Sequence, residues 1–339
     1  AEKEFGGAPL GDKRLSQRLV EIAADKAEQP ARAYCGVAEG DWPKVKAYYR
    51  FIDKPDDSAV TMSAILQPHR ERTIQRMKAQ KTVLCIQDGS DLNYSTLERV
   101  SVMDREADPE NEFRTSFFEI FDDQRRNSSR VDLLIRAQHN RKTMGENKLF
   151  EEVMQSPIQS RITIKIPRQS ARVKKKSQKA RSKRAARIAE VTVRYIRTEL
   201  KPPPYFQEMP PISLWIIHVQ EENPPAGAQA VEWFLLTTID IQSRDDALDC
   251  ITWYCLRWRI EDWHRVLKSG CSVEALAHKT AERLKRAIAI NLVIAWRIML
   301  MTLMGREMPE LPPEVLFSDI EIEVLRAYAK KKALTFRAV

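Results

Sequence analysis

Residues Trp253–Lys268 read WYCLRWRIEDWHRVLK, and the interpretation of the whole chain starts from this stretch. Its large apolar residues recur at spacings of three and four, which predicts the buried stripe of one amphipathic helix. These residues are Trp253, Leu256, Ile260, Trp263 and Leu267. A second stripe follows one position later in each turn, so it should lie at the boundary between core and solvent. Its members are Tyr254, Arg257, Glu261, His264 and Lys268.

The carboxylate of Glu261 has two interpretations. In the structural one, Glu261 pairs with Arg257 at i−4 and with Arg265 at i+4 on an ordinary surface helix. In the functional one, Glu261 belongs to a group of carboxylates that holds metal ions, and it needs acidic partners elsewhere in the chain. The helix alone does not decide between the two.

Two short apolar runs supply such partners. Lys81–Ile86 (KTVLCI) is followed closely by Asp88, and Val100–Met103 (VSVM) is followed by Asp104. We expect both runs to be buried strands, and functional side chains collect just past the ends of such strands. Mg²⁺ prefers oxygen ligands, and two such ions ~4 Å apart suit phosphoryl transfer. The sequence therefore predicts two Mg²⁺ ions, with Mn²⁺ as a substitute, held by Asp88, Asp104 and Glu261.

The charge and composition favour a polyanionic partner. The formal net charge is +9, and nine basic residues with no acidic one lie between Arg172 and Arg187. This segment is either a solvated basic loop or a phosphate-binding one. The five cysteines show no metal-ligand spacing, which suits reduced thiols in a cytoplasmic protein. No apolar run approaches the ~20 residues of a membrane span, so we expect residues 288–296 and 298–304 to form buried helix.

Local patterns divide the chain into regions. Residues 10–80 are expected to be helical, including a helix over Trp42–Ile52 and another that Asp57 or Ser58 is able to cap. A strand is predicted at 131–136. Further β-type runs predict an antiparallel insertion, and they lie at 161–166, 190–196, 212–219 and 232–238. After Asp245 the chain returns to helix until about residue 305, and a short helix follows near the C-terminal end.

These residues resemble a known family of transposases. Tyr254, Arg257, Glu261 and Lys268 match the YREK signature of the cut-and-paste group of bacterial DDE insertion-sequence transposases, with every spacing kept. IQDGSDLNYS, which carries Asp88, and VMDREAD, which carries Asp104, are similar to the family's first two acidic motifs. LGDKRLSQRL and AYYRFIDKP resemble its N-terminal DNA-binding region, and NPPAGAQAVEWFLLTT resembles the end of its β insertion.

The resemblance implies an α/β fold with a ribonuclease H-like catalytic core interrupted by a β insertion. The expected regions are a helical DNA-binding region at 1–78, the core at 79–155 and 243–305, the insertion with its basic segment at 156–242, and a C-terminal helical region at 306–339. It also implies cleavage of transposon ends through a hairpin intermediate, strand transfer into target DNA, and a homodimeric synaptic complex. The protein would be cytoplasmic and associated with the nucleoid when bound to DNA.

The same resemblance assigns residues that contact DNA. Tyr254, Arg257 and Lys268 would bind phosphates near the cut, and Trp233 would stack on or displace a flipped base. Trp233 is equally interpretable as a core residue of a strand. Arg14, Arg18 and Arg50 match positions that contact the terminal repeat in this family.

The spacing of the first two acids departs from the family. Asp88 and Asp104 are sixteen positions apart (104 − 88), whereas a ribonuclease H-like sheet places two strands between them. Either those strands are absent from the protein or a stretch of chain is missing here. We favour the second because losing two strands would expose a sheet edge. It predicts a gap at Leu97–Glu98 far longer than the ~3.8 Å between neighbouring Cα atoms.

Three functions remain compatible with these features. The first is an active transposase. The second is a catalytically inactive DNA-binding derivative or inhibitor of transposition, which would keep the basic surfaces. The third is a metal-dependent nuclease that cuts DNA without joining it, because both reactions use the same metal ions.

Overall fold

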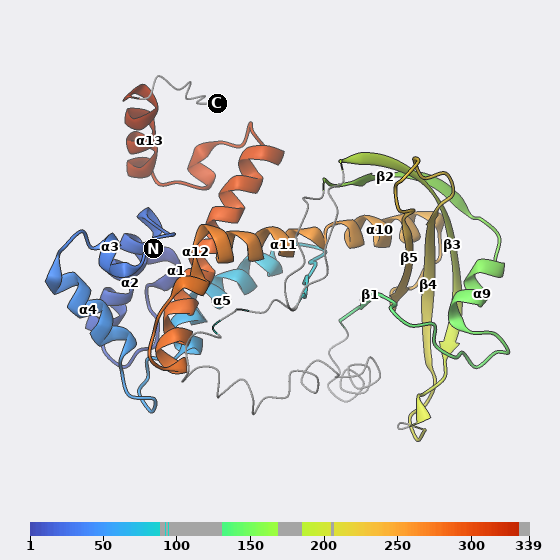
Figure 1. Cartoon of the computed structure of the whole chain (residues 1–339), viewed down its shortest axis with the longest axis horizontal. Coiled ribbons are helices and arrows are strands. Elements are labelled where there is room, and N and C mark those ends of the chain that lie inside the picture. The colour runs from blue at the N-terminus through green and yellow to red at the C-terminus, as the bar shows by residue number, and fades with distance from the viewer. Residues whose placement is uncertain (89–91, 93, 95–130, 169–184, 205–206, 332–339) are drawn as a thin grey trace. The chain divides into compact units, whose positions relative to one another are not determined.

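The computed structural model describes residues 1–88, 92, 94, 131–168, 185–204 and 207–331. The chain forms two compact units, shown by element in Figure 1. Unit 1 contains residues 1–108 and 257–339, and unit 2 contains residues 109–256. Asp104, the predicted gap at Leu97–Glu98, the predicted strand at 100–103 and most of the basic segment lie outside the described residues.

The described part of unit 1 is helical. Its N-terminal helices are α1 (Glu2–Phe5), α2 (Lys13–Glu28), α3 (Tyr34–Val37), α4 (Trp42–Ile52) and α5 (Met62–Lys78). Its C-terminal elements are α11 (Trp258–Arg265), η3 (Val266–Gly270), η4 (Val273–Ala275), α12 (Ala281–Glu307), η5 (Pro313–Val315) and α13 (Asp319–Lys331).

Side chains that precede the helices explain several of their starts. Asp12 accepts a hydrogen bond from the backbone N–H of Arg14, and Asp41 accepts one from Lys44. The expected helix over Trp42–Ile52 is confirmed. Thr61 caps α5, so the expected cap at Asp57 or Ser58 is wrong. Ser58 already belongs to the turn after Pro55, to which its backbone N–H donates, and the chain turns into helix only three residues later.

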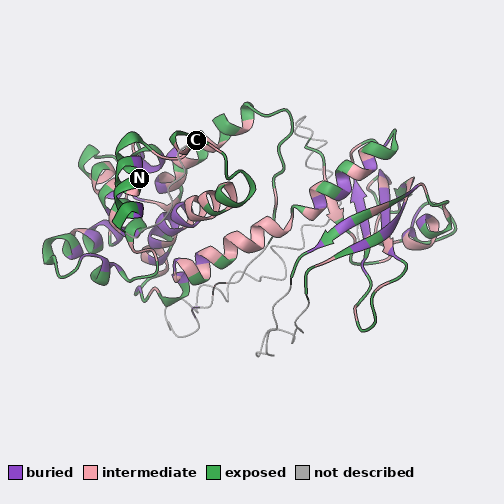
Figure 2. Ribbon diagram, turned by 90° about the horizontal axis from the view of Figure 1, so that it is seen from above, coloured by how far each residue is buried: buried purple, intermediate pink, exposed green. Residues whose placement is uncertain are grey.

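The helix α12 forms the centre of the helical core. Ala289, Ile290, Val293 and Ile294 pack with buried residues of α2, α4 and α5. Among the described helices, α12 is long and apolar enough to cross a membrane, but its first half is a core helix with buried Arg286 and Asn291. Figure 2 colours the chain by burial, with buried residues in both the helices and the strands. The expectation of a buried helix is therefore confirmed for 288–296, while 298–304 is only partly covered.

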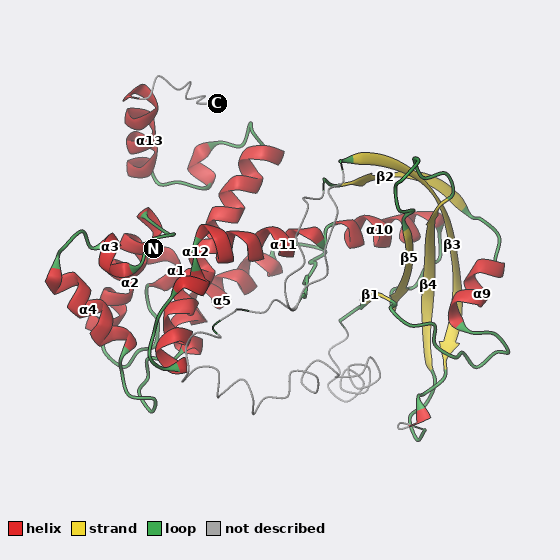
Figure 3. Cartoon of the chain, in the orientation of Figure 1, coloured by secondary structure: helices red, strands yellow, loops and turns green. Residues whose placement is uncertain are grey.

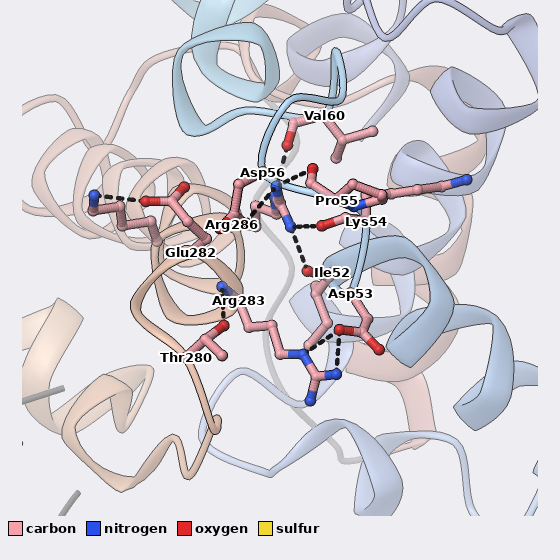
Figure 4. A network of polar contacts seen from close by, with 11 residues as sticks. Ile52, Asp53, Lys54, Pro55, Asp56, Val60, Thr280, Glu282, Arg283 and Arg286 are labelled. Atoms are coloured by element: carbon pink, nitrogen blue, oxygen red, sulfur yellow. Dashed lines mark hydrogen bonds and ion pairs between the residues drawn. The ribbon is translucent and has the colours of Figure 1, made fainter. Parts of the chain in front are cut away.

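Arg286 joins α12 to the connection between α4 and α5. Its side chain is 1 % exposed. The guanidinium group donates to the backbone carbonyl oxygens of Val60, Ile52, Lys54 and Pro55 at 2.6, 2.9, 2.5 and 3.1 Å (Figure 4). The carbonyls at a helix C-terminus lack partners within the helix, so a buried cation there satisfies them and complements the helix dipole. The polar contacts of one side chain thus fix the whole connection.

Unit 2 contains the described strands (Figure 3). They are β1 (Leu134–Arg136), β2 (Ser160–Ile166), β3 (Arg187–Leu200), β4 (Ile212–Glu221) and β5 (Glu232–Thr237). The order is β1-β5-β4-β3-β2, and every pairing is antiparallel. The four predicted strands of the insertion are therefore confirmed. The strand predicted at 131–136 is shorter and pairs with β5 in this sheet.

Two helices cover the sheet of unit 2. Helix α10 (Arg244–Cys255) packs on one face through Ala247, Cys250 and Ile251. Helix α9 (Leu149–Gln155) covers the other face through Leu149 and Val153. Strand residues alternate between the two faces, as the period of two requires.

The described architecture is thus a helical unit and a helix-covered antiparallel sheet. A ribonuclease H-like sheet remains a prediction, because the second acidic motif and the chain around it lie outside the described part. The strand predicted at Lys81–Ile86 is wrong, since this segment is described and has no strand. An apolar run becomes a strand only when a neighbouring strand supplies hydrogen bonds, and no described strand pairs with it.

Candidate functional site

The helix predicted over Trp253–Lys268 is interrupted. Helix α10 ends at Cys255 and α11 begins at Trp258, with a turn at Leu256 and Arg257 between them. The backbone N–H of Leu256 donates to the carbonyl of Trp253 at 3.0 Å, so the bond spans three residues instead of four. The boundary between the two units falls at this turn. Glycine and proline are absent from the stretch, which is why the sequence does not signal the break.

The interruption changes both predicted stripes. Of the predicted buried stripe only Leu267 is buried, while Leu256 is 36 % exposed. Tyr254, expected at the solvent boundary, is buried in unit 2, and Arg257, Glu261 and Lys268 belong to unit 1. Tyr254 and Arg257 therefore do not lie on one face of a continuous helix, as the sequence predicted.

Glu261 and Asp88 both contact the guanidinium group of Arg257. Nη1 of Arg257 donates to Oδ2 of Asp88 at 3.0 Å, and its Nη2 lies 3.6 Å from Oε1 of Glu261. All three side chains are between 32 % and 41 % exposed, so they are partly accessible to solvent. Two predicted acids from distant parts of the sequence thus reach the same cation.

His264 and Lys268 belong to the same charged surface. Burial lowers the pKa of His264, the carboxylates of Asp88 and Glu261 act to raise this pKa, and the ammonium group of Lys268 acts to lower it. Asp88, Glu261 and Lys268 thus each lie within electrostatic reach of the His264 ring. We name Asp88, Arg257, Glu261, His264 and Lys268 the carboxylate–arginine cluster.

The predicted ion pair with Arg265 is not formed. Arg265 pairs instead with Asp262 three residues before it, while Arg257 makes the predicted i−4 pair with Glu261. After Arg265 the helix widens into the π-helical turn η3, closed by the bond from Cys271 N–H to the Val266 carbonyl at 2.8 Å. Such turns are rare and frequent at functional sites. Here the turn carries Lys268.

The donor atoms of the cluster fit a hard divalent cation. Asp88 and Glu261 offer carboxylate oxygens, and both already approach one positive group. Within the described residues no three His, Cys, Asp or Glu side chains form a ready metal-binding group. The third predicted ligand, Asp104, lies outside the described residues. The carboxylate oxygens of Asp88 and Glu261 are compatible with the predicted ions.

The other predicted DNA contacts lie on different surfaces. Arg14 and Arg50 are exposed on α2 and α4, and Arg18, also on α2, pairs with Glu21 at 2.9 Å. Trp233 packs edge-on against Tyr254 in unit 2, with ring centroids 5.0 Å apart, and joins the cluster beneath α10. This packing gives Trp233 a core role in the described conformation, and its contact with a base remains a prediction.

Sequence reasoning missed Arg286. The sequence does contain a signal for its burial, because Arg286 occupies the same helical face as Ile290 and Val293, where an apolar residue is expected. An arginine on the apolar stripe of a core helix indicates a buried cation that needs carbonyl or carboxylate partners.

The N-terminal region is helical, and Arg14 on α2 and Arg50 on α4 are exposed. Comparison with protein families identifies it more closely. Residues 1–56 match the family model described as "Transposase DNA-binding". The chain therefore carries a transposase DNA-binding domain, which contains Arg14, Arg18 and Arg50.

Proposed function

We propose that this protein is a DNA transposase that binds the terminal inverted repeats of a transposon, cuts them by metal-dependent phosphoryl transfer through a hairpin intermediate, and joins them to target DNA. The DNA-binding domain at 1–56 supports the nucleic-acid partner. The observation that carries the catalytic part is the meeting of Asp88 and Glu261 at one guanidinium group. A metal centre for phosphate chemistry requires carboxylates that approach the same positive group, as Asp88 and Glu261 do.

Each acidic residue has a distinct role in this proposal. Asp88 would be shared by two Mg²⁺ or Mn²⁺ ions, and Asp104 and Glu261 would each hold one. Ions of this kind supply activation of the attacking oxygen and stabilisation of the leaving oxygen when bound. Tyr254, Arg257 and Lys268 would bind the phosphates of the transposon end, and Trp233 would stack on a displaced base. The protein would act in the cytoplasm, on the nucleoid.

A cleavage assay tests the proposal. A labelled duplex carrying the sequence that borders the gene is incubated with the protein, Mg²⁺ and a supercoiled plasmid as target. We expect cut ends, hairpins and joined products, all lost in Asp88→Ala. Cutting without joining would identify the nuclease instead. Binding without any cutting, with or without Mn²⁺, would identify the inactive DNA-binding derivative.

Lys268 offers a separate prediction about DNA contacts. Replacing it with Ala removes one positive charge from the carboxylate–arginine cluster. We expect binding of the transposon end to weaken and the slope of log affinity against log salt to fall by about one unit. Filter binding at several salt concentrations measures both. An unchanged slope would contradict a phosphate contact, and Lys285→Ala, on the outer face of α12, serves as a control.

A homodimer is part of the proposal, and α13 presents a surface for it. Ile320, Val324 and Tyr328 form one row at four-residue spacing and are 75 %, 62 % and 55 % exposed. Acidic residues lie in the first half of α13, and Arg326, Lys330 and Lys331 lie in the second half. Antiparallel packing against α13 of a second copy would place each acidic half beside a basic half.

The dimer surface has its own test. We expect Val324→Glu to reduce the fraction of protein–DNA complexes that contain two protein chains, because it adds a like charge to the centre of the apolar row. Sedimentation of the complexes with paired transposon ends measures this fraction. An unchanged fraction would exclude this face of α13 as the contact.

A further inference from the structure

Arg257 lies between Asp88 and Glu261, the two predicted metal ligands that belong to the described part of the chain. Its two terminal nitrogens contact different carboxylates, Asp88 at 3.0 Å and Glu261 at 3.6 Å. The guanidinium carbon lies 5.0 Å from the centre of the Trp258 ring, so the flat group also rests on an aromatic face. One cation therefore neutralises part of the repulsion between two acids that the chain brings together.

A divalent cation that binds the carboxylate oxygens of both Asp88 and Glu261 would compete with the guanidinium group of Arg257 for its place. A carboxylate oxygen that accepts a hydrogen bond from a guanidinium group has fewer lone pairs for a metal ion, and two positive charges repel each other at this distance. Arg257 lies in the turn between α10 and α11, and its side chain is about one-third exposed. A long side chain at such a place is able to move without unfolding a helix.

We propose that Arg257 is a counter-ion that occupies the metal-binding position in the DNA-free protein, and that it moves to a DNA phosphate when divalent cations bind. The inference rests on the proposed function, which assigns the cations and the phosphate contact. It adds that metal binding and Arg257 compete for the same carboxylates. Metal affinity of the protein alone is then low, and DNA raises it by supplying another partner for the guanidinium group, as reciprocal linkage requires.

The inference separates Arg257 from its neighbour Arg259. Arg259 is on α11 two positions later and pairs with Glu307 of α12, away from Asp88 and Glu261. Arg257→Gln removes the positive charge and keeps much of the side-chain length, and Arg259→Gln makes the same chemical change outside the cluster. The two variants are therefore matched.

Mn²⁺ binding to the full chain without DNA is the decisive measurement. We expect Arg257→Gln to bind Mn²⁺ roughly three- to tenfold more tightly than the wild type, since exposed ion pairs each contribute up to ~1 kcal/mol. Electron paramagnetic resonance of free Mn²⁺ follows the titration. Arg259→Gln should bind like the wild type. A raised melting temperature on addition of Mn²⁺, larger in Arg257→Gln than in the wild type, gives a second readout.

Other outcomes have definite meanings. One outcome is that Arg257→Gln binds Mn²⁺ no more tightly than the wild type, while Glu261→Gln abolishes Mn²⁺ binding. This outcome would overturn the counter-ion role and leave the transposase proposal intact. An equal gain in Arg259→Gln would also overturn it, because general charge removal would then suffice. Failure of both the wild type and Arg257→Gln to bind Mn²⁺ would overturn the metal centre itself and the counter-ion role with it.

Discussion

Glu261→Gln is expected to abolish metal-dependent cutting while the protein stays folded and still binds DNA. The substitution preserves the size of the side chain but removes the charge that a hard cation requires. A metal ligand contributes several kcal/mol of transition-state stabilisation, so we expect the cleavage rate to fall by a factor of about a thousand or more. Initial rates of end cleavage in Mg²⁺ measure the effect, and filter binding of the same duplex checks the DNA complex.

Asp262→Asn is the matched control for this variant. Asp262 is the next residue on α11, carries the same charge and pairs with Arg265 instead of Arg257. We expect its cleavage rate to lie within a few-fold of the wild type. Cleavage by Glu261→Gln at a comparable rate would remove Glu261 from the metal centre, and a change in its circular dichroism spectrum would show that the helix itself had been damaged.

Arg286→Met is expected to produce the largest loss of stability. The change leaves the carbonyl oxygens of Val60, Ile52, Lys54 and Pro55 without the donor that now satisfies them. Unsatisfied buried polar groups cost ~1–3 kcal/mol each, and relaxation of the connection recovers part of this. We expect a net loss of about 3–5 kcal/mol in the free energy of unfolding of unit 1. Urea denaturation followed by tryptophan fluorescence measures it.

Arg283 provides the comparison for Arg286. It lies one turn earlier on α12 and pairs with Asp53, but Arg283 is 24 % exposed and Asp53 is 52 % exposed (Figure 4). Solvent screens such a pair, so Arg283→Met should cost less than ~1 kcal/mol. Equal losses for the two variants would contradict the role of the buried carbonyl contacts.

The core of the DNA-binding domain includes residues outside the range 1–56 that matches the family model. The core that holds α2 and α4 includes Ile65 of α5 and Ala289, Ile290 and Val293 of α12. Residues 1–56 alone would expose the apolar surface that these side chains cover. A fragment of residues 1–56 should therefore be largely unfolded, and its circular dichroism spectrum compared with that of the full chain tests this.

Local chemistry explains which parts of the fold were predictable. Helix α4 begins after Asp41 and a proline follows at its second position, so both the cap and the restricted backbone mark its start. The strand at 160–166 alternates apolar and polar residues and is flanked by Pro157 and Pro167, and the strand at 212–221 is a mostly apolar run that follows Pro210 and Pro211. These signals depend on neighbours in the chain and need no tertiary contact.

Other parts depended on contacts between distant residues. Lys81–Ile86 has the composition of a strand, but strand formation needs a partner that the described residues do not provide. The turn at Leu256 and Arg257 contains no helix breaker, and it coincides with the boundary between two cores. Helical periodicity continues across it, because periodicity records which residues are apolar and not where two units separate.

The order of residue types alone indicated a nucleic-acid partner, the antiparallel insertion, and three acids suited to hard cations. Charge, periodicity and spacing are local properties, so they survive without coordinates. The meeting of Asp88 with Glu261 at Arg257, the burial of Tyr254, and the carbonyl contacts of Arg286 required the folded chain. Each of them depends on the distance between residues far apart in sequence, and that distance is determined by the packing of whole elements.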